Sequence, residues 1–358
     1  MTSPPLTIEL RATRGPYWHK WRTGLFGTPV NTIITLATLA LLFATVPGFI
    51  RWAIIDATWI GTSKDCMAGT GACWAFVTAK IYFIVFAFFP PDLFWRPALV
   101  IALLIGLLAI TAMPRFWRRE TVLLWVAIPI ISWLLLAGTF TPPTVPSNQW
   151  GGIAVTLLVW LGCFASAGPI ALALALARRS KMGGVRTMAI VFIELMRGTP
   201  MVAVLYAAML ILPMMVPNGE LIDKLLRAMI CITLFWSAYV AEVIRAGLQA
   251  IPEGQYEAAT SLGLSYWRSM RLVILPQALR VVVPALVNLA IGFLLATSLL
   301  AVIGIYDLLN AAKNAAVDPN WIGFYDEAYF VAASIYFVFC FTGSRYSLWL
   351  EKRLSRPR

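Results

Sequence analysis

The residues with the most ordered spacing lie in one long segment, the central loop (residues 241–275), which separates two apolar runs. Within it, Glu257, Ala258 and Ala259 stand together, and Gly263 follows four residues after Ala259. Small alanines let a short helix approach a partner closely, and glycine allows a sharp left-handed exit from that helix. A glutamate near a helix start is favoured by the helix dipole and accepts hydrogen bonds. This chemistry is partner recognition, with no bond made or broken.

The second half of the central loop continues the pattern at fixed offsets. Val273 follows Gly263 by ten residues, and Leu275 and Pro276 come after one intervening residue. A structureless loop of about 35 residues is uncommon in a folded protein, so we expect this segment to be folded and used. An ordinary amphipathic surface helix would not explain these spacings.

Residues for catalysis or cofactor binding are missing from the sequence. His19 is the single histidine, so a histidine-based metal site or a catalytic triad is not expected, and His19 is interpreted as a surface side chain. The phosphate loop G-x-x-x-x-G-K-[ST] is absent. We therefore predict no catalytic residue, no metal, and no cofactor or nucleotide bound by this chain.

A second group of candidates lies within a later apolar run. Glu194 and Arg197 are three residues apart and could pair on one helix face, or one of them could serve as a gate or meet a substrate. Gly198, Thr199 and Pro200 follow and are predicted to break the helix. A new helix starting at the proline would direct its N-terminal dipole at an anionic carboxylate.

Three polar residues recur on another run, Asn288, Thr297 and Ser298. Hydrogen bonding between helices is the simpler interpretation, and lining of a transport pathway is the alternative.

Composition sets the environment in which these residues must act. The chain has 358 residues, 60% apolar and 12% charged, with a mean hydropathy of +0.81. Soluble proteins carry about 25% charged residues, and so little charge cannot cover this much apolar surface. A soluble enzyme, a disordered chain and a disulfide-stapled secreted domain are excluded. The sequence predicts an all-α polytopic membrane protein with about eight transmembrane helices.

Spans of the ~30 Å bilayer core need about 20 mostly apolar residues. Eight runs qualify: residues 30–50, 97–113, 121–138, 152–177, 187–213, 225–241, 281–304 and 328–349. A ninth run, 74–89, is short and contains Lys80. We expect it to lie on the membrane surface within an external segment, 57–96.

Basic residues decide this topology, since they gather in cytoplasmic loops. The net charge of +12 is explained by that bias, so a nucleic-acid partner is not expected. Basic clusters occur in the N-terminal arm, in the tail and after the second, fourth and sixth runs, and they fall on one side only if residues 66–89 do not cross. Both termini are then cytoplasmic. Cys66 and Cys73 face a compartment that, in a bacterium, permits a disulfide.

Five regions follow along the chain. They are a cytoplasmic arm (1–29), a three-span extension (30–138), an external proline-rich linker (139–149), a five-span module (150–350) and a basic cytoplasmic tail (351–358).

The central loop resembles the EAA loop of ABC importer permeases. The matching residues are Glu257, Ala258, Ala259, Gly263, Val273, Leu275 and Pro276, and the variation is valine where isoleucine is commonest. The resemblance implies a type I ABC importer permease whose cytoplasmic coupling helix docks on a separate ATPase.

Further motifs resemble the polar amino acid importer permeases. They are GG-x-x-x-T at 151–156, E-x-x-RGTP at 194–200 and A-Y-x-A-E-x-x-R-x-G at 238–247. CWAF at 73–76 and FFPPDLFWRP at 88–97 are similar to the M subunit of general L-amino acid (Aap-type) systems. The stretch at 295–298 departs from the family, because a lysine and the acidic or polar residue usual before Thr-Ser are missing there.

The resemblance implies a permease subunit that carries L-amino acids across the inner membrane of a Gram-negative bacterium. Its implied partners are a sister permease, two ATPase subunits that use ATP, a periplasmic binding protein and membrane lipid. Restriction to glutamate, glutamine, aspartate and asparagine is the alternative within this class. An ion-coupled secondary transporter is the rival outside it, although Glu194 alone approaches the buried ionisable residue that such a protein needs.

Overall fold

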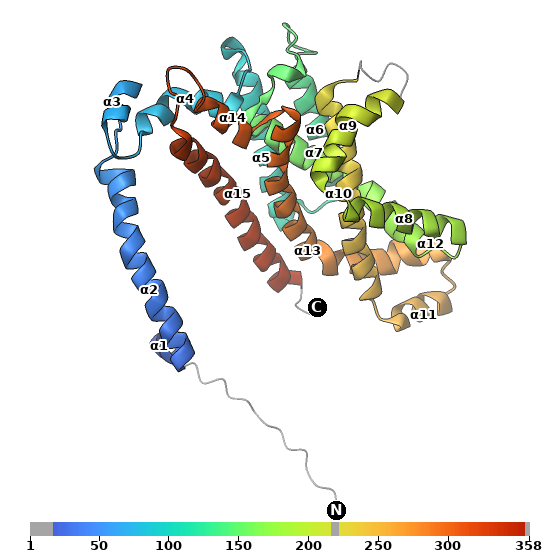
Figure 1. Cartoon of the computed structure of the whole chain (residues 1–358). Helices are drawn as coiled ribbons and strands as arrows, with labels where there is room; N and C mark the ends of the chain where they lie inside the picture. The colour runs from blue at the N-terminus through green and yellow to red at the C-terminus, as the bar shows by residue number, and fades with distance from the viewer. Residues whose placement is uncertain (1–16, 216–221, 355–358) are drawn as a thin grey trace, which may run out of the picture. The chain divides into compact units, whose positions relative to one another are not determined.

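The computed structural model describes residues 17–215 and 222–354, and it divides into two compact units at Ala75 and Phe76. The side chain of His19, most of the N-terminal arm and the last residues of the tail lie outside the described part. The two units are treated separately below (Figure 1).

The first unit holds the first predicted span. Helix α1 (Tyr17–Phe26) precedes α2 (Pro29–Ile50), which continues as a π-helical turn, and α3 (Ser63–Ala68) follows. Thr28 caps α2, since its side chain accepts a hydrogen bond from the Asn31 amide. No residue of α2 is buried, as suits a helix surrounded by lipid. A disulfide joins Cys66 to Cys73.

The second unit contains the remaining helices and one short strand. They are α4 (Trp74–Phe86, which starts in the first unit), α5 (Trp95–Ala112), α6 (Arg119–Ala137), α7 (Gly152–Arg178), α8 (Gly183–Gly198), α9 (Met201–Met215), α10 (Lys224–Gln249), α11 (Glu253–Ser261), α12 (Tyr266–Ser269), α13 (Leu275–Ala296), β1 (Tyr306–Asp307), α14 (Leu308–Ala315) and α15 (Tyr325–Leu354). In the described part of the chain, seven helices are long and apolar enough to span a membrane, and eight if α8 and α9 form one bent span. The all-α class and the predicted number of spans are confirmed.

Helix α4 is a 13-residue apolar helix. At 1.5 Å per residue it covers about 20 Å, less than the ~30 Å bilayer core. Lys80 on this helix forms an ion pair with Asp318, with 2.7 Å between Nζ and Oδ2, and this hydrogen bond lowers the pKa of Asp318. These features agree with a segment that does not cross, while its external placement stays a prediction.

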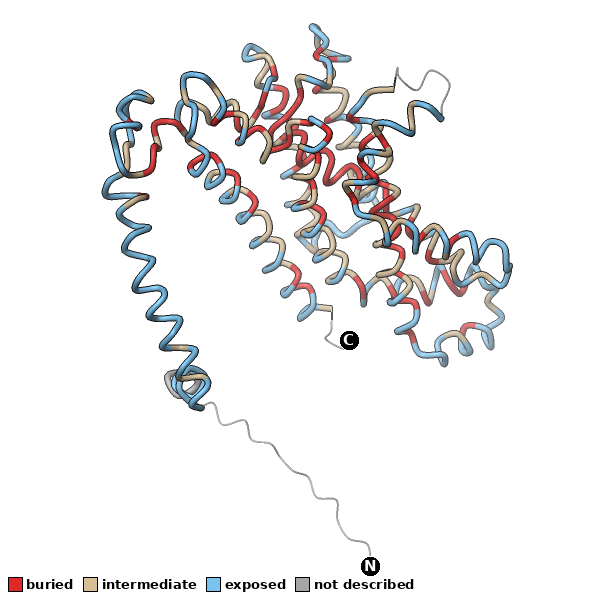
Figure 2. The backbone as a smooth tube through the Cα atoms, viewed as in Figure 1, coloured by how far each residue is buried: buried red, intermediate tan, exposed pale blue. Residues whose placement is uncertain are grey.

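Small residues let the central helices of the module approach closely. Helices α7 and α10 lie side by side, and Ala171, Ala175, Ala238 and Ala241 are fully buried in the core near them. Interfaces of small residues are typical of helices packed in membranes. The buried positions concentrate on α7 and α10, whereas lipid-facing helices are largely exposed (Figure 2).

The linker is fixed to α5 by a buried arginine. Arg96 is fully buried, and its Nη1 donates to the Pro143 carbonyl over 2.9 Å while Nη2 donates to the Thr141 carbonyl. Gly138 ends α6 with a φ of 73° and lies against this guanidinium. Helices α5 and α6 also pack on α7, so the second and third spans share one compact unit with the module.

The glycine pair that opens the module lies at the N-terminal end of α7, which we call the outer end because the sequence predicts it to be external. Steric constraints explain why both residues are glycine. Gly151 and Gly152 form parallel bridges with Tyr306 and Asp307. Gly152 has a φ of +62°, and a Cβ there would collide with the Val85 carbonyl. A Cβ on Gly151 would lie 2.6 Å from the Tyr306 carbonyl oxygen. Only glycine permits the backbones to approach this closely.

Candidate functional site: the central loop and the Glu242 network

The central loop is largely helical: residues 241–249 are the last turns of α10, α11 follows, and α12 runs through a π-helical turn (Met270–Ile274) into α13. The expected loop is therefore shorter than its sequence bounds, because the helices on both sides extend into it. The expected exit at Gly263 is present, since its φ is +70°. The Leu264 amide donates to the Ala259 carbonyl over 3.2 Å, which closes the helix end around the left-handed glycine. Ala259 is buried, whereas Ala258 and Glu257 are exposed. The expectation that Glu257 lies near the helix start is wrong, because α11 begins four residues earlier, at Glu253.

Exposed apolar residues follow Glu257 and Ala258 along the central loop. Leu262 is 77% exposed, Tyr266 53% and Trp267 68%. Large exposed side chains of this kind mark contact surfaces for other molecules. This surface is therefore suited to docking.

The inner face of α11 is tied to three helices of the module. The Tyr256 hydroxyl donates to the Leu248 carbonyl of α10 over 3.0 Å and accepts from Arg179 Nη1, next to the end of α7, over 3.1 Å. Gln277 of α13 donates to the Gln255 side chain over 3.0 Å. Side-chain hydrogen bonds therefore link α11 to α10, to α13 and to the residue that follows α7.

The later residues of the EAA pattern join the central loop to the span that follows. Val273 and Leu275 are half-buried against the hydrophobic core, which includes Ile274. Pro276 is the second residue of α13 and follows directly on the π-helical turn Met270–Ile274 that joins α12 to α13.

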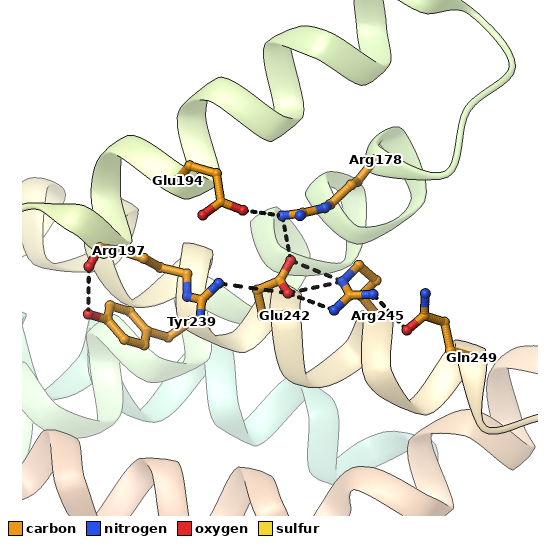
Figure 3. A network of polar contacts seen from close by, with 7 residues as sticks. All are labelled: Arg178, Glu194, Arg197, Tyr239, Glu242, Arg245 and Gln249. Carbon is orange, nitrogen blue, oxygen red and sulfur yellow. Dashed lines mark hydrogen bonds and ion pairs between the residues drawn. The ribbon is translucent and has the colours of Figure 1, made fainter.

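A charged cluster lies beside these contacts, at the ends of α7, α8 and α10. We call it the Glu242 network, and it comprises Arg178, Glu194, Arg197, Tyr239, Glu242, Arg245 and Gln249 (Figure 3). Glu242 is its hub, with a side chain only 14% exposed.

Three arginines from three helices converge on the Glu242 carboxylate. Arg178 Nη1 lies 2.7 Å from Oε1, Arg245 Nη2 lies 2.9 Å from Oε2, and Arg197 Nη1 lies 3.8 Å from Oε2. Arg178 also contacts Glu194 at 3.0 Å. The cost of burying the Glu242 carboxylate is offset by several cationic donors. Removal of one arginine would leave part of that buried negative charge without a partner.

The expected pair between Glu194 and Arg197 is wrong. Within the described residues the two side chains have different partners. Glu194 forms an ion pair with Arg178, and Arg197 forms one with Glu242. Spacing along one helix permits a contact, but α7 and α10 offer closer charges from outside the helix. Arg178 and Glu242 were not among the functional residues expected from the sequence, although Glu242 lies within the A-Y-x-A-E-x-x-R-x-G motif.

The predicted helix break at Gly198–Pro200 is confirmed. Helix α8 ends at Gly198, α9 begins at Met201, and the two axes differ by 106°. Pro200 lies just before α9, and its carbonyl accepts from the Ala203 amide. The Arg197 carbonyl, which the break leaves without a helical donor, accepts from the Tyr239 hydroxyl over 3.3 Å. The network thus stabilises the broken end of α8.

The polar residues of the seventh span are not brought together with the Glu242 network by any contact in the described structure. Thr297 is buried and donates to the Leu294 carbonyl, and Ser298 donates to the Leu295 carbonyl. Asn288 is exposed on α13. Thr297 also lies 3.5 Å from the Tyr336 hydroxyl of α15, which agrees with a helix-to-helix contact. A pathway role for these residues stays a prediction.

The fold is thus a bundle of membrane-length helices with a short helix, α11, hydrogen-bonded to its core. A family model described as "Binding-protein-dependent transport system inner membrane component" matches residues 167–356. The chain belongs to this family.

Relatives of known class extend the match over the whole chain. The chain is 41% identical over 365 residues to the inner membrane amino-acid ABC transporter permease protein YhdY of Escherichia coli K12, covering 100% of this chain and 98% of that protein. It is 34% identical over 411 residues to the glutamate/glutamine/aspartate/asparagine transport system permease protein BztC of Rhodobacter capsulatus, covering 94% of each. A crystal structure described as an amino acid ABC transporter with histidines has a TM-score of 0.51 and 34% identity, covering 56% of this chain and 92% of that one.

The chain is therefore a permease subunit of an amino-acid ABC importer and crosses the inner membrane several times.

Proposed function

We propose that this chain forms half of the transmembrane pathway of an L-amino acid importer, as a heterodimer with a sister permease. Two ATPase subunits bind from the cytoplasm and use the ATP, and a periplasmic binding protein delivers the substrate. Both termini lie in the cytoplasm. The observation that carries the proposal is α11, whose outer face is exposed while its inner face is hydrogen-bonded to three spans.

The EAA residues have distinct parts in this docking. Glu257 and Ala258 face the ATPase, Ala259 seats α11 on the module, and Gly263 turns the chain away from the interface. Closure of the ATPases on ATP moves α11 as a rigid body, and Tyr256 passes the movement to α10 and to the end of α7.

The Glu242 network converts this movement into a change at the broken helix. Arg178 is adjacent to Arg179, which contacts α11, and Arg178 also holds Glu194 on α8. A shift of α7 therefore changes the position of α8 relative to α10. Residues 194, 197, 198, 199 and 200 act as the gate in this scheme, with Arg197 near the Tyr239 ring at 5.8 Å.

The substrate class is general L-amino acids, and the binding protein makes most of the selection. The alternative is restriction to glutamate, glutamine, aspartate and asparagine, as the printed name of the Rhodobacter relative states for that protein. Uptake by the reconstituted system of a basic, an aliphatic and an acidic amino acid separates these two ranges.

The energy source is tested by reconstituting the complete importer into liposomes. We expect uptake of labelled amino acid to need ATP on the cytoplasmic side and to continue when a protonophore removes the proton gradient. Uptake driven by a gradient without ATP would instead identify an ion-coupled transporter. Thermal unfolding of the reconstituted protein checks that an inactive preparation is folded.

The topology is tested by cysteines introduced at Thr70 and Asp92 in a chain that lacks Cys66 and Cys73. Because residues 57–96 are proposed to be external, both sites should react with an impermeant thiol reagent from the periplasmic side. Labelling at one site only would show that the segment crosses the membrane.

A further inference from the structure

A cavity opens at the end of the module where the central loop enters α13. It has a volume of about 1010 Å³ and is lined by the end of α5, the connection to α6, the first turns of α13 and the last turns of α15. Since three spans end around it, the cavity lies at a membrane surface.

Three basic side chains line this cavity. Arg280 comes from α13, and Lys352 and Arg353 come from α15. All three are exposed, none forms an ion pair among the residues that the structure describes, and the lining contains no carboxylate. The site therefore carries an uncompensated positive charge, unlike the Glu242 network, in which two glutamates face three arginines.

The aromatic residues of the lining are held in place by hydrogen bonds. Trp117 Nε1 donates to the Thr111 carbonyl over 2.9 Å, and the Tyr346 hydroxyl contacts the same carbonyl at 3.3 Å. Tyr346 stacks on Trp349 with ring centroids 5.6 Å apart, and the Arg353 guanidinium lies 5.2 Å from the Trp349 ring. One side of the cavity is thus formed by aromatic side chains that hydrogen bonds and ring contacts hold in position.

We propose that this cavity binds the headgroup of an anionic phospholipid. Tryptophan and tyrosine favour the headgroup level of a bilayer, and basic pockets between spans on the cytoplasmic side bind anionic headgroups. The bound lipid neutralises Arg280, Lys352 and Arg353 and bridges α13 to α15. This inference goes beyond the proposed function, and it rests on the proposed topology only for the leaflet from which the lipid comes.

The test compares lipid retention by the full-length chain in nanodiscs, measured by native mass spectrometry. One set of discs contains phosphatidylcholine alone and the other contains phosphatidylcholine with phosphatidylglycerol. The pocket variant is Arg280→Gln, Lys352→Gln and Arg353→Gln. Its matched control is Lys181→Gln, Arg186→Gln and Arg268→Gln, which removes the same charge from exposed sites outside the cavity.

We expect the unaltered chain and the control to retain phosphatidylglycerol in preference to phosphatidylcholine. Each basic residue at an anionic surface contributes about fivefold, so the pocket variant should retain at least about tenfold less. Equal retention by the pocket variant, or equal loss in the control, would overturn the proposal. So would displacement of the lipid by inorganic phosphate, which would identify a free-anion site.

Thermal unfolding in phosphatidylcholine discs shows whether the pocket variant is folded. If it is not, Arg353→Gln alone replaces it, and a preference for phosphatidylglycerol unchanged from that of the unaltered chain would then overturn the proposal. Neither outcome depends on transport, so a failure here is distinct from a failure of the proposed importer function.

Discussion

The two ends of the permease module are held together by different kinds of contact. At the outer end, main chains meet directly, since Gly151 and Gly152 pair with Tyr306 and Asp307. One short side chain adds to these contacts, because the Thr156 hydroxyl accepts from the Leu308 amide over 2.9 Å. At the central-loop end, long charged side chains meet around Glu242 (Figure 3).

From this difference we infer which end of the module can move. Contacts between main chains have one geometry, and the glycine pair leaves no space for sliding. Arginine side chains are long and rotatable, and Glu242 already shares its carboxylate among three of them, so partners can exchange with small changes of distance. We expect the outer end to stay fixed while the central-loop end moves.

The largest loss of stability is expected from Gly152→Ala, a substitution at the outer end, which we expect to stay fixed. The new Cβ collides with the Val85 carbonyl and also forces alanine to a φ of +62°. We predict a loss of about 3 kcal/mol or more in the free energy of unfolding, and little protein in the membrane. Gly292→Ala is the control, because open space surrounds that helical glycine. A thermal unfolding midpoint unchanged from that of the unaltered chain would show that the outer end is not rigid.

The next effect is expected from Gly263→Asp at the moving end. Space around Gly263 is open, so the chain should insert and fold with about 1 kcal/mol of backbone strain. The new charge beside the docking face should nevertheless abolish uptake. Gly323→Asp is a matched control, since it places the same residue at a φ of +101°, also in open space, in the loop before α15. Equal loss of uptake in both variants would assign the defect to strain and contradict the docking role.

A smaller effect is expected within the Glu242 network, measured by double-mutant cycles on thermal unfolding. Arg178 lies 2.7 Å from Glu242 and Arg197 lies 3.8 Å from it. We predict a coupling energy of about 1–3 kcal/mol for Arg178→Ala with Glu242→Ala, and less for Arg197→Ala with Glu242→Ala.

The cycle of Glu194→Ala with Arg197→Ala serves as the reference for the network. These two residues do not pair in the described structure, so their effects should add within about 0.5 kcal/mol. A coupling energy here as large as that of the Arg178 cycle would restore a direct pair on α8.

The smallest effect is a pH dependence at the fixed end. Burial raises the pKa of Asp307 to about 6 from its ordinary value of 3.8. The folded chain therefore holds a proton that the unfolded chain releases, so the contribution to stability is full below the unfolded value and falls as pH rises towards 6. Asp307→Asn should remove this slope and keep the cap of α14. Unfolding midpoints at several pH values check it, and an unchanged slope would contradict the assignment.

Local patterns were sufficient to predict much of the fold. The break at Gly198–Pro200 and the left-handed exit at Gly263 depend on a few adjacent residues, so the sequence alone located them. The spans follow from apolar length, which the bilayer thickness fixes. Helix α4 is shorter than the helices that could span a membrane, as its short apolar run indicated, while its failure to cross stays a prediction based on the distribution of basic residues.

Partners across helices could not be predicted in the same way. Glu194 was expected to pair within its own helix, but its charge is met by Arg178, sixteen residues away on α7. That choice depends on the faces that α7, α8 and α10 present to one another, which spacing along one helix does not determine. The close approach of Gly152 to Val85 was missed for the same reason.

The buried arginine in the first turn of α5 has a consequence for exchanging parts between related permeases. The Arg96 guanidinium donates hydrogen bonds to the carbonyls of Thr141 and Pro143. A chimaera joined between α6 and the linker would separate this cation from the loop shaped around it, and a buried charge without its acceptors is costly. The boundary of a working chimaera should therefore follow residue 149, so that the linker and α5 come from the same parent protein.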